Sequence, residues 1–141
     1  MKGVTALIIS SLNGFSLNLV QKFVKQGCNI ILNGNKTDEN LIKTIQNECQ
    51  ESKTMFFSAN IQNELDRYKL IEQILNQFQH IDILIINNEC KQHYRASIDE
   101  FPIEKWKDII DYNLISNFAL IKLLWPHMKR QHFGRIINIV S

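Results

Sequence analysis

Cysteine, glycine and proline are all scarce in this 141-residue sequence, which contains three, five and two of them. The cysteines, Cys28, Cys49 and Cys90, are odd in number and have no Cys-x-x-Cys spacing, so they predict neither a disulfide framework nor a thiolate metal site. The four histidines form no His-Glu-x-x-His or comparable set of ligands. We therefore expect reduced thiols, as in the cytoplasm, and no metal.

Long apolar runs and charge of a single sign are also missing. No apolar stretch reaches the roughly 18 residues of a membrane span, and the run that follows Met1-Lys2 stops at Ser10, too early for a signal peptide. The net charge of +2 is spread along the chain, without the basic stripe and interleaved aromatics of nucleic-acid-binding proteins. These absences predict a cytoplasmic protein that binds neither membranes nor nucleic acid.

Short apolar runs alternate with segments in which apolar residues recur at helical spacing. Runs that are apolar on successive residues are typical of strands buried on both faces of a parallel sheet. The expected strands are Val4–Ile9, Cys28–Asn33, Thr54–Ser58, Ile81–Ile86 and Arg135–Val140. Since right-handed crossovers put helices on both faces, the alternation predicts one α/β domain over residues 1–141, a doubly wound parallel sheet with strand order 3-2-1-4-5.

Four helices are expected between these strands. The first closes at Gly27 and the second covers about 39–50. The third is expected to turn five apolar side chains inward: Leu65, Tyr68, Ile71, Leu75 and Phe78. The fourth begins near Pro102 and extends to Met128 with more apolar residues than one buried face needs. Either it contacts a second subunit, or Pro126 divides it into a long and a short piece, or both.

The first turn of the chain is expected to lie at the ligand-binding edge of the sheet. Ligands in such sheets bind beyond the carboxyl ends of the strands, at the switch point between the first and fourth strands. That topology brings Ser10–Ser16, Asn87–Cys90 and Ser141 around one crevice. The helix that follows the turn would aim unpaired N–H groups at a phosphate. The sequence therefore predicts a nucleotide site in this crevice.

Several segments in the second half of the chain carry a family resemblance. They are Gln92-His93, Phe101-Pro102, Glu104–Trp106, Asn113-Leu114, Pro126–Lys129 and Phe133–Ile139. With them, the sequence resembles the short-chain dehydrogenase/reductase family, and within it enzymes that act on a small 3-hydroxy acid. The resemblance implies a Rossmann-like dinucleotide-binding domain and an NAD-dependent oxidoreductase. It covers essentially the whole chain but only about the first half of a family member.

The resemblance also implies roles for individual residues. Gly14 and its turn correspond to the pyrophosphate site, and Asn60 stands where the family commonly has an Asp that contacts adenine. The residues that it assigns to the cofactor are Ser10, Leu12, Asn13, Gly14, Phe15, Asn33, Asn60, Ile61, Asn87 and Asn88. Asn113 and Ser141 match the asparagine and serine of the catalytic tetrad, and Gln92 resembles a contact to the substrate carboxylate. The resemblance favours NAD over NADP, and the segment 33–36 carries neither the expected acidic residue nor a convincing phosphate-binding arginine.

These residues also have ordinary structural explanations. Asn113 could face solvent or hydrogen-bond a backbone carbonyl of its own helix. Ser141 could be a plain serine at the end of a strand. Gln92 and His93 could be solvated loop residues.

Two departures from the family pattern concern cofactor binding. Ser10 and Ser16 stand where the fingerprint has glycines, and Glu89-Cys90 replace an Ala-Gly pair. A β-carbon at a position that needs a positive φ costs roughly 1–2 kcal/mol and can close the phosphate approach. We therefore expect weak NAD binding, and we expect Ser10→Gly with Ser16→Gly to strengthen it.

The family's Tyr-x-x-x-Lys motif is missing. Tyr68, Tyr94 and Tyr112 are followed four residues later by Glu72, Ile98 and Ser116, and the family motif would lie just beyond Ser141. In the family, the tyrosine of this motif is the general acid/base. General acid–base catalysis typically accelerates a reaction by about 10²–10⁴-fold. Two functions therefore stay open: an oxidoreductase completed by residues outside this chain, or an inactive remnant or nucleotide-binding fragment. In either case the unpaired last strand and the helix over 102–130 predict self-association or a homo-oligomer.

Overall fold

The computed structural model describes residues 1–10, 14–34, 43, 45, 47, 52–87 and 94–140. Its strands are β1 (Thr5–Ser10), β2 (Asn29–Asn33), β3 (Thr54–Phe57), β4 (Ile83–Asn87) and β5 (Arg135–Asn138). All neighbouring strands pair in parallel, in the order β3-β2-β1-β4-β5. The expected Rossmann-like fold and its strand order are confirmed.

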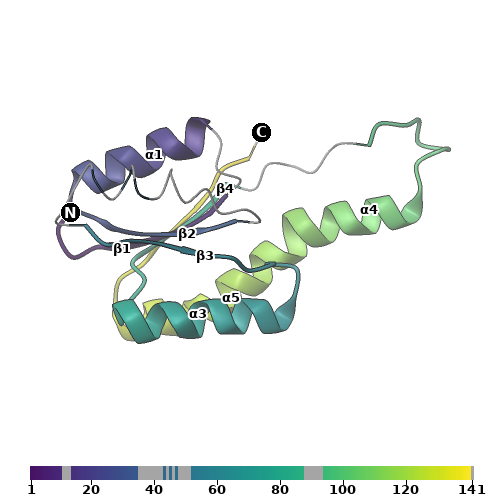
Figure 1. Cartoon of the computed structure of the whole chain (residues 1–141). Coiled ribbons are helices and arrows are strands. Elements are labelled where there is room, and N and C mark those ends of the chain that lie inside the picture. The colour runs from purple at the N-terminus through teal and green to yellow at the C-terminus, as the bar shows by residue number, and fades with distance from the viewer. Residues whose placement is uncertain are drawn as a thin grey trace.

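Helices cover both faces of the sheet (Figure 1). Helix α1 (Gly14–Lys25) lies on one face, while α3 (Glu64–Phe78) and α5 (Ser116–Arg130) lie side by side on the other. Successive residues of β1 point to opposite faces, so Ala6 and Ile8 pack in the cluster with α1, whereas Leu7 and Ile9 pack in the cluster with α3 and α5. The two apolar clusters hold the carboxyl ends of the strands in a fixed arrangement.

The inward face of α3 differs from the expected one. Its buried residues are Leu70, Ile71, Ile74 and Phe78. Leu65 and Tyr68, expected inside, are 67% and 54% exposed. Leu65 precedes Ile74 by two and a half turns at about 3.6 residues per turn, which puts the two on opposite sides of the helix. The expectation was wrong for Leu65 and Tyr68 because it counted the helical spacing from the first turn, and the face defined in that way is rotated away from the sheet.

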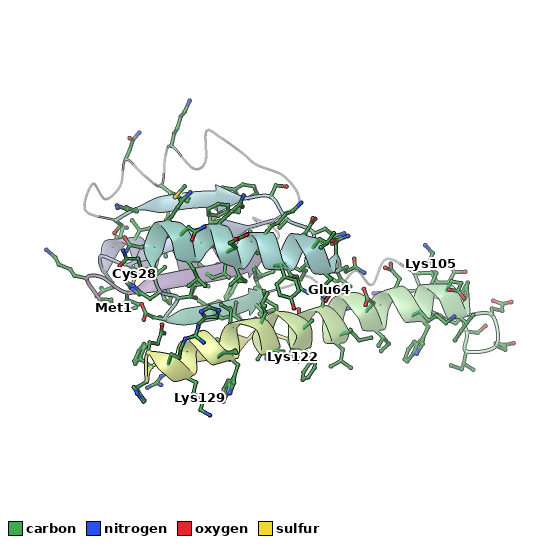
Figure 2. All side chains as sticks on the ribbon, turned by 90° about the horizontal axis from the view of Figure 1, so that it is seen from below. Met1, Cys28, Glu64, Lys105, Lys122 and Lys129 are labelled. Atoms are coloured by element: carbon green, nitrogen blue, oxygen red, sulfur yellow. The ribbon has the colours of Figure 1, made fainter. Side chains whose placement is uncertain are left out.

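The fourth helical segment consists of α4 (Ile103–Ile110), a π-helical turn η1 (Asp111–Ile115) and α5. Pro126 lies inside α5 and does not divide it, contrary to one of the expected alternatives. Pro126 has no N–H to donate to the carbonyl of Lys122, and both residues are exposed. Figure 2 shows α4, with Lys105, extending beyond the sheet, and none of its residues is buried.

The helix expected over 39–50 lies largely outside the described residues. Lys43, Ile45 and Asn47 are described and are helical. Ile45 is buried in the cluster on the α1 face of the sheet. These three residues agree with the expected helix, and the rest of it stays a prediction.

Candidate functional site

The carboxyl ends of β1 and β4 meet as the topology predicts. Ser10 and Asn87 are register partners on the two strands. The side-chain amide of Asn87 donates to Oγ of Ser16 at 3.0 Å and to Oγ of Ser10 at 3.4 Å. The hydroxyls of Ser10 and Ser16 are also hydrogen-bonded to each other. These three buried side chains therefore join β1, β4 and the first turn of α1.

This arrangement corrects the expected strain at the two serines. Among the described non-glycine residues, only Gln79 and His132 have a positive φ. Ser10 and Ser16 thus adopt conformations that any residue tolerates. Their β-carbons carry no left-handed strain, and their hydroxyls satisfy one another in the interior. Of the two reasons for expecting tighter binding from glycine at these positions, relief of backbone strain does not hold. Opening of the phosphate approach stays a prediction.

Gly14 is the first residue of α1. It and Phe15 are exposed, and a β-carbon added at Gly14 would meet no atom within 4 Å. The first turn of α1 contains no acidic residue. A helix N-terminus whose own first turn carries no carboxylate is suited to an anionic group.

The end of β2 lies beside the end of β1. A β-carbon at Gly34 would lie 2.8 Å from the carbonyl oxygen of Ser10, so the two chain segments approach closely there. Asn33 is buried, and its amide donates to the carbonyls of Phe57 and Ala59 at 2.9 and 3.2 Å. The side chain of Asn33 therefore joins β2 to the end of β3, and these hydrogen bonds stabilise the sheet.

The loop after β3 carries Asn60 and Ile61, both assigned to the cofactor by resemblance. Asn60 is exposed, and its Oδ1 accepts from the backbone N–H of Gln62 at 3.1 Å in a local turn. The side chain of Ile61 is only 4% exposed and packs in the core, so a ligand could reach only its backbone. The Gln62 amide donates to Asp108 at 3.2 Å and Asp111 at 2.8 Å, which ties this loop to α4 and η1.

Asn113 lies in the π turn. Its side-chain amide donates to the Ile109 carbonyl at 2.9 Å, as the ordinary structural explanation proposed. Two neighbours do the same: Ser116 donates to the Tyr112 carbonyl at 2.6 Å, and Asn117 donates to the Asn113 carbonyl at 2.8 Å. Asn113 is therefore held firmly at a helix irregularity, a feature that often accompanies functional sites.

A groove of about 530 Å³ opens between the helical segment and the end of β5. Asn113, Asn117 and Asn138 contribute its polar groups. The other lining residues are apolar: Ile86, Ile109, Ile110, Leu114, Phe118, Ile121, Ile139 and Val140. Val140 directly precedes Ser141 in the chain. The fold thus brings Asn113 close to the chain segment that leads into Ser141.

Other candidate residues lie outside the described part of the chain. They are Leu12, Asn13, Asn88, Gln92 and Ser141, together with Glu89-Cys90. Their roles stay predictions from the resemblance.

Burial raises the pKa of the Cys28 thiol, which lies just before β2, at the opposite end of the strands from Ser10.

Within the described ranges, no three His, Cys, Asp or Glu side chains gather as a metal ion would require. In the same part of the chain, no helix combines the length and apolar character needed to cross a membrane.

The family model described as short chain dehydrogenase matches residues 4–141. This chain belongs to that family. It is 33% identical over 141 residues to a D-beta-hydroxybutyrate dehydrogenase of Cupriavidus necator, covering 100% of this chain and 54% of the relative. A protein of the same name from Rhizobium meliloti is also 33% identical, with 97% and 53% covered. The chain spans about half the length of the curated relatives it matches.

Two solved structures have the same fold. A 3-oxoacyl-reductase structure from Bacillus thuringiensis has a TM-score of 0.83 at 27% identity, covering 96% of this chain and 56% of the other. An NADH-dependent reductase complexed with NAD also has a TM-score of 0.83, at 21% identity, covering 97% and 59%. At that identity the second likeness concerns the fold alone.

Two sets of side-chain hydrogen bonds near the site were not predicted from the sequence. Ser16 was assessed only as a missing glycine, although a buried serine facing Asn87 from another element can serve as its hydrogen-bond partner. Asn117 was not considered. The four-residue spacing of Asn113 and Asn117 is the signal that could have indicated side-chain bonds to the helix backbone.

Proposed function

We propose that this chain forms the NAD-binding half of a cytoplasmic oxidoreductase that acts on a small 3-hydroxy acid. The observation that carries the proposal is the meeting of Ser10 and Asn87 at the carboxyl ends of β1 and β4, where both strand ends are joined to Ser16 in the first turn of α1. It lies at the switch point where open parallel sheets bind ligands. The names of the relatives, D-beta-hydroxybutyrate dehydrogenases, support the substrate class.

The residues at the crevice fit a dinucleotide. Gly14 leaves open space at the start of α1, and the first turn has no carboxylate that would repel a pyrophosphate. Asn87 fixes the neighbouring strand end through Ser10 and Ser16. When bound, NAD supplies the acceptor for a hydride from the hydroxyl-bearing carbon of a substrate. In this proposal, the backbone N–H groups at the start of α1 hold the pyrophosphate.

The remaining roles follow from the resemblance. Asn113, which lines the groove, and Ser141 serve as tetrad residues, and Gln92 contacts the substrate carboxylate. Tyrosine and lysine of a Tyr-x-x-x-Lys motif are not among these 141 residues. The proposal therefore separates two properties: the chain binds the cofactor, and it does not by itself complete general acid–base catalysis. The alternative is a fragment without any enzymatic role.

Calorimetric titration of the 141-residue chain with NAD, and separately with NADP, tests the proposal. We expect saturable NAD binding, weaker NADP binding, and no NADH production from D-3-hydroxybutyrate above a blank. Asn87→Ala should weaken NAD binding, whereas Asn18→Ala, on the exposed side of α1, should not. Absence of NAD binding would favour the fragment without an enzymatic role. Steady NADH production would show that the missing tyrosine and lysine are not needed.

A further inference from the structure

We propose that Gln62 is a positioning residue whose side chain ties the loop after β3 to the π turn, and so holds Asn113 relative to the part of the site that meets the cofactor. The inference rests on the proposed function, in which Asn60 and the backbone of Ile61 face NAD and Asn113 serves the reaction. It deepens that function by adding a residue to which the resemblance gives no role, and by linking two parts of the site to each other.

The Gln62 amide spans the junction of α4 and η1. Its Nε2 donates to Oδ2 of Asp111 at 2.8 Å and to Oδ1 of Asp108 at 3.2 Å. Asp111 is the first residue of η1, and Asp108 lies in the last turn of α4. Figure 2 shows α3 beginning, at Glu64, beside this helical segment. Hydrogen bonds to ionised carboxylates are stronger than those between neutral groups. Because like charges on neighbouring positions of a helix repel, an amide that donates to both also offsets their repulsion.

The loop that carries Gln62 is itself fixed on the start of α3. The Gln62 N–H donates to Oδ1 of Asn60 at 3.1 Å, and the Asn60 N–H donates to Oδ2 of Asp66 at 3.1 Å. Arg67 donates from Nη1 to the Ile61 carbonyl at 2.6 Å. A displacement of Asn60 or Ile61 would therefore pass to the Gln62 side chain, because the loop between them is held at each residue.

The other end of the contact is equally well defined. Asp111 and Asn113 belong to the same π turn. The Asn113 amide donates to the Ile109 carbonyl at 2.9 Å, which fixes the Asn113 side chain on the backbone of the helical segment. A group that holds Asp111 therefore also sets the position of Asn113. Gln62 connects two parts of the proposed site that lie far apart in the sequence.

This connection predicts an energetic coupling between NAD and the π turn. Occupation of the loop would favour the loop conformation from which Gln62 reaches both carboxylates, and that conformation keeps η1 bound to the loop. A ligand shifts such an equilibrium only by the difference between its affinities for the two states. Coupling between two sites is commonly about 5- to 150-fold. A network that only stabilises the surface would protect η1 to the same degree with and without NAD.

Hydrogen–deuterium exchange of the 141-residue chain, read by mass spectrometry at one fixed protein concentration, tests the inference. Saturating NAD should slow exchange in peptides that cover Asp111–Ser116 by about fivefold or more. Gln62→Met keeps the length of the side chain but has no N–H to donate. In this variant exchange should be faster without NAD and should change little when NAD is added. Gln77→Met, at an exposed position of α3, is the matched control and should behave as the unmodified chain does.

An exchange of donors and acceptors separates the contact from the loss of glutamine as such. Gln62→Glu brings three carboxylates together and should speed exchange in η1 more than Gln62→Met does. Adding Asp108→Asn and Asp111→Asn allows the same hydrogen bonds in the reverse direction, so this triple variant should recover the protection by NAD. Circular dichroism and thermal unfolding of each variant establish that its fold is kept.

Calorimetric titration of the same variants with NAD distinguishes the inference from the proposed function. If NAD binds without slowing exchange in η1, or slows it equally in the unmodified chain and in Gln62→Met, the inference is overturned. Unchanged exchange in NAD-free Gln62→Met overturns it whether or not NAD binds, and so does a triple variant that resembles Gln62→Glu. If NAD does not bind, while Gln62→Met loosens the turn and the triple variant restores it, only the proposed function is contradicted.

Discussion

Asn87 at the end of β4 donates a 3.0 Å hydrogen bond to the hydroxyl of Ser16 in the first turn of α1. Ser10, at the carboxyl end of β1, is hydrogen-bonded to both of these side chains. All three side chains are buried. The position of the α1 N-terminus relative to the switch point therefore depends on these polar contacts as well as on apolar packing.

Replacing Asn87 by alanine should lower the free energy of unfolding by about 1–3 kcal/mol, because it removes the donor shared by two buried hydroxyls. Urea denaturation followed by circular dichroism measures the change. Asn18→Ala, also an asparagine-to-alanine change but at an exposed position of α1, is the control and should stay within about 0.5 kcal/mol. Equal stability of Asn87→Ala and the unmodified chain would contradict the role of the network.

Replacing both Ser10 and Ser16 by glycine should destabilise the protein and should not tighten NAD binding. The double variant loses the buried hydroxyls and adds backbone freedom in β1 and α1, at about 0.5–1 kcal/mol per glycine. Denaturation and NAD calorimetry measure the two effects. Ser58→Gly, at an exposed position after β3, controls for glycine alone. Tighter NAD binding by the double variant would restore the idea that side chains at these positions obstruct the phosphate.

Acidification should destabilise the protein in part through His127. Burial lowers the pKa of His127, and the nearby Arg130 cation lowers it further. Arg130 donates to Nδ1 of His127 at 2.8 Å, a bond that requires the neutral ring at that nitrogen. A depressed folded-state pKa means that the unfolded chain binds more protons, so stability is present above the ordinary histidine pKa of about 6.5 and falls as pH decreases below it.

His127→Gln should therefore reduce the loss of stability between about pH 7 and pH 5. Thermal unfolding over that range measures the slope. His132→Asn changes an exposed histidine in the turn after α5 and should leave the slope nearly unchanged. An identical pH dependence for His127→Gln and the unmodified chain would remove His127 from the explanation.

The chain on its own should self-associate at micromolar concentration through the edge of β5 and the exposed apolar side chains of α4 and α5. Ile137 is 43% exposed on β5, and Trp106 and Trp125 are 53% and 59% exposed. Ile137→Lys should shift the distribution toward monomer, since charge on an edge strand opposes pairing. Sedimentation velocity measures the distribution, with Ile98→Lys as an exposed control. A clean monomer of the unmodified chain at all concentrations would show that these surfaces do not attract other copies.

The sheet was predictable because each strand is a short run of apolar residues and strand order follows from right-handed crossovers. The same reasoning placed Ser10 and Asn87 together without any motif. Leu65 and Tyr68 were misplaced because helical spacing identifies an apolar stripe but not how far the sheet extends beneath it. The pairing of Ser16 with Asn87 was not predictable from spacing, since it joins residues 71 positions apart.

The π turn at Asp111–Ile115 was likewise hidden from the sequence pattern. The apolar residues continue through it with spacings that an uninterrupted helix also allows. Its side-chain bonds, from Asn113, Ser116 and Asn117 to carbonyls four residues earlier, become visible only when the backbone is known. The groove depends on this turn and was therefore missed as well.

The π turn also takes up one residue between α4 and α5. Each residue advances an α-helix by about 100°, and a π turn accommodates one residue more than an α turn. Deleting a single residue from Asp111–Ile115 would therefore allow an uninterrupted α-helix in which Trp106 keeps nearly its present direction relative to Leu124. The same deletion in the regular part of α5 would instead turn α4 by about 100°, so the tolerance to a change in length is confined to the π turn.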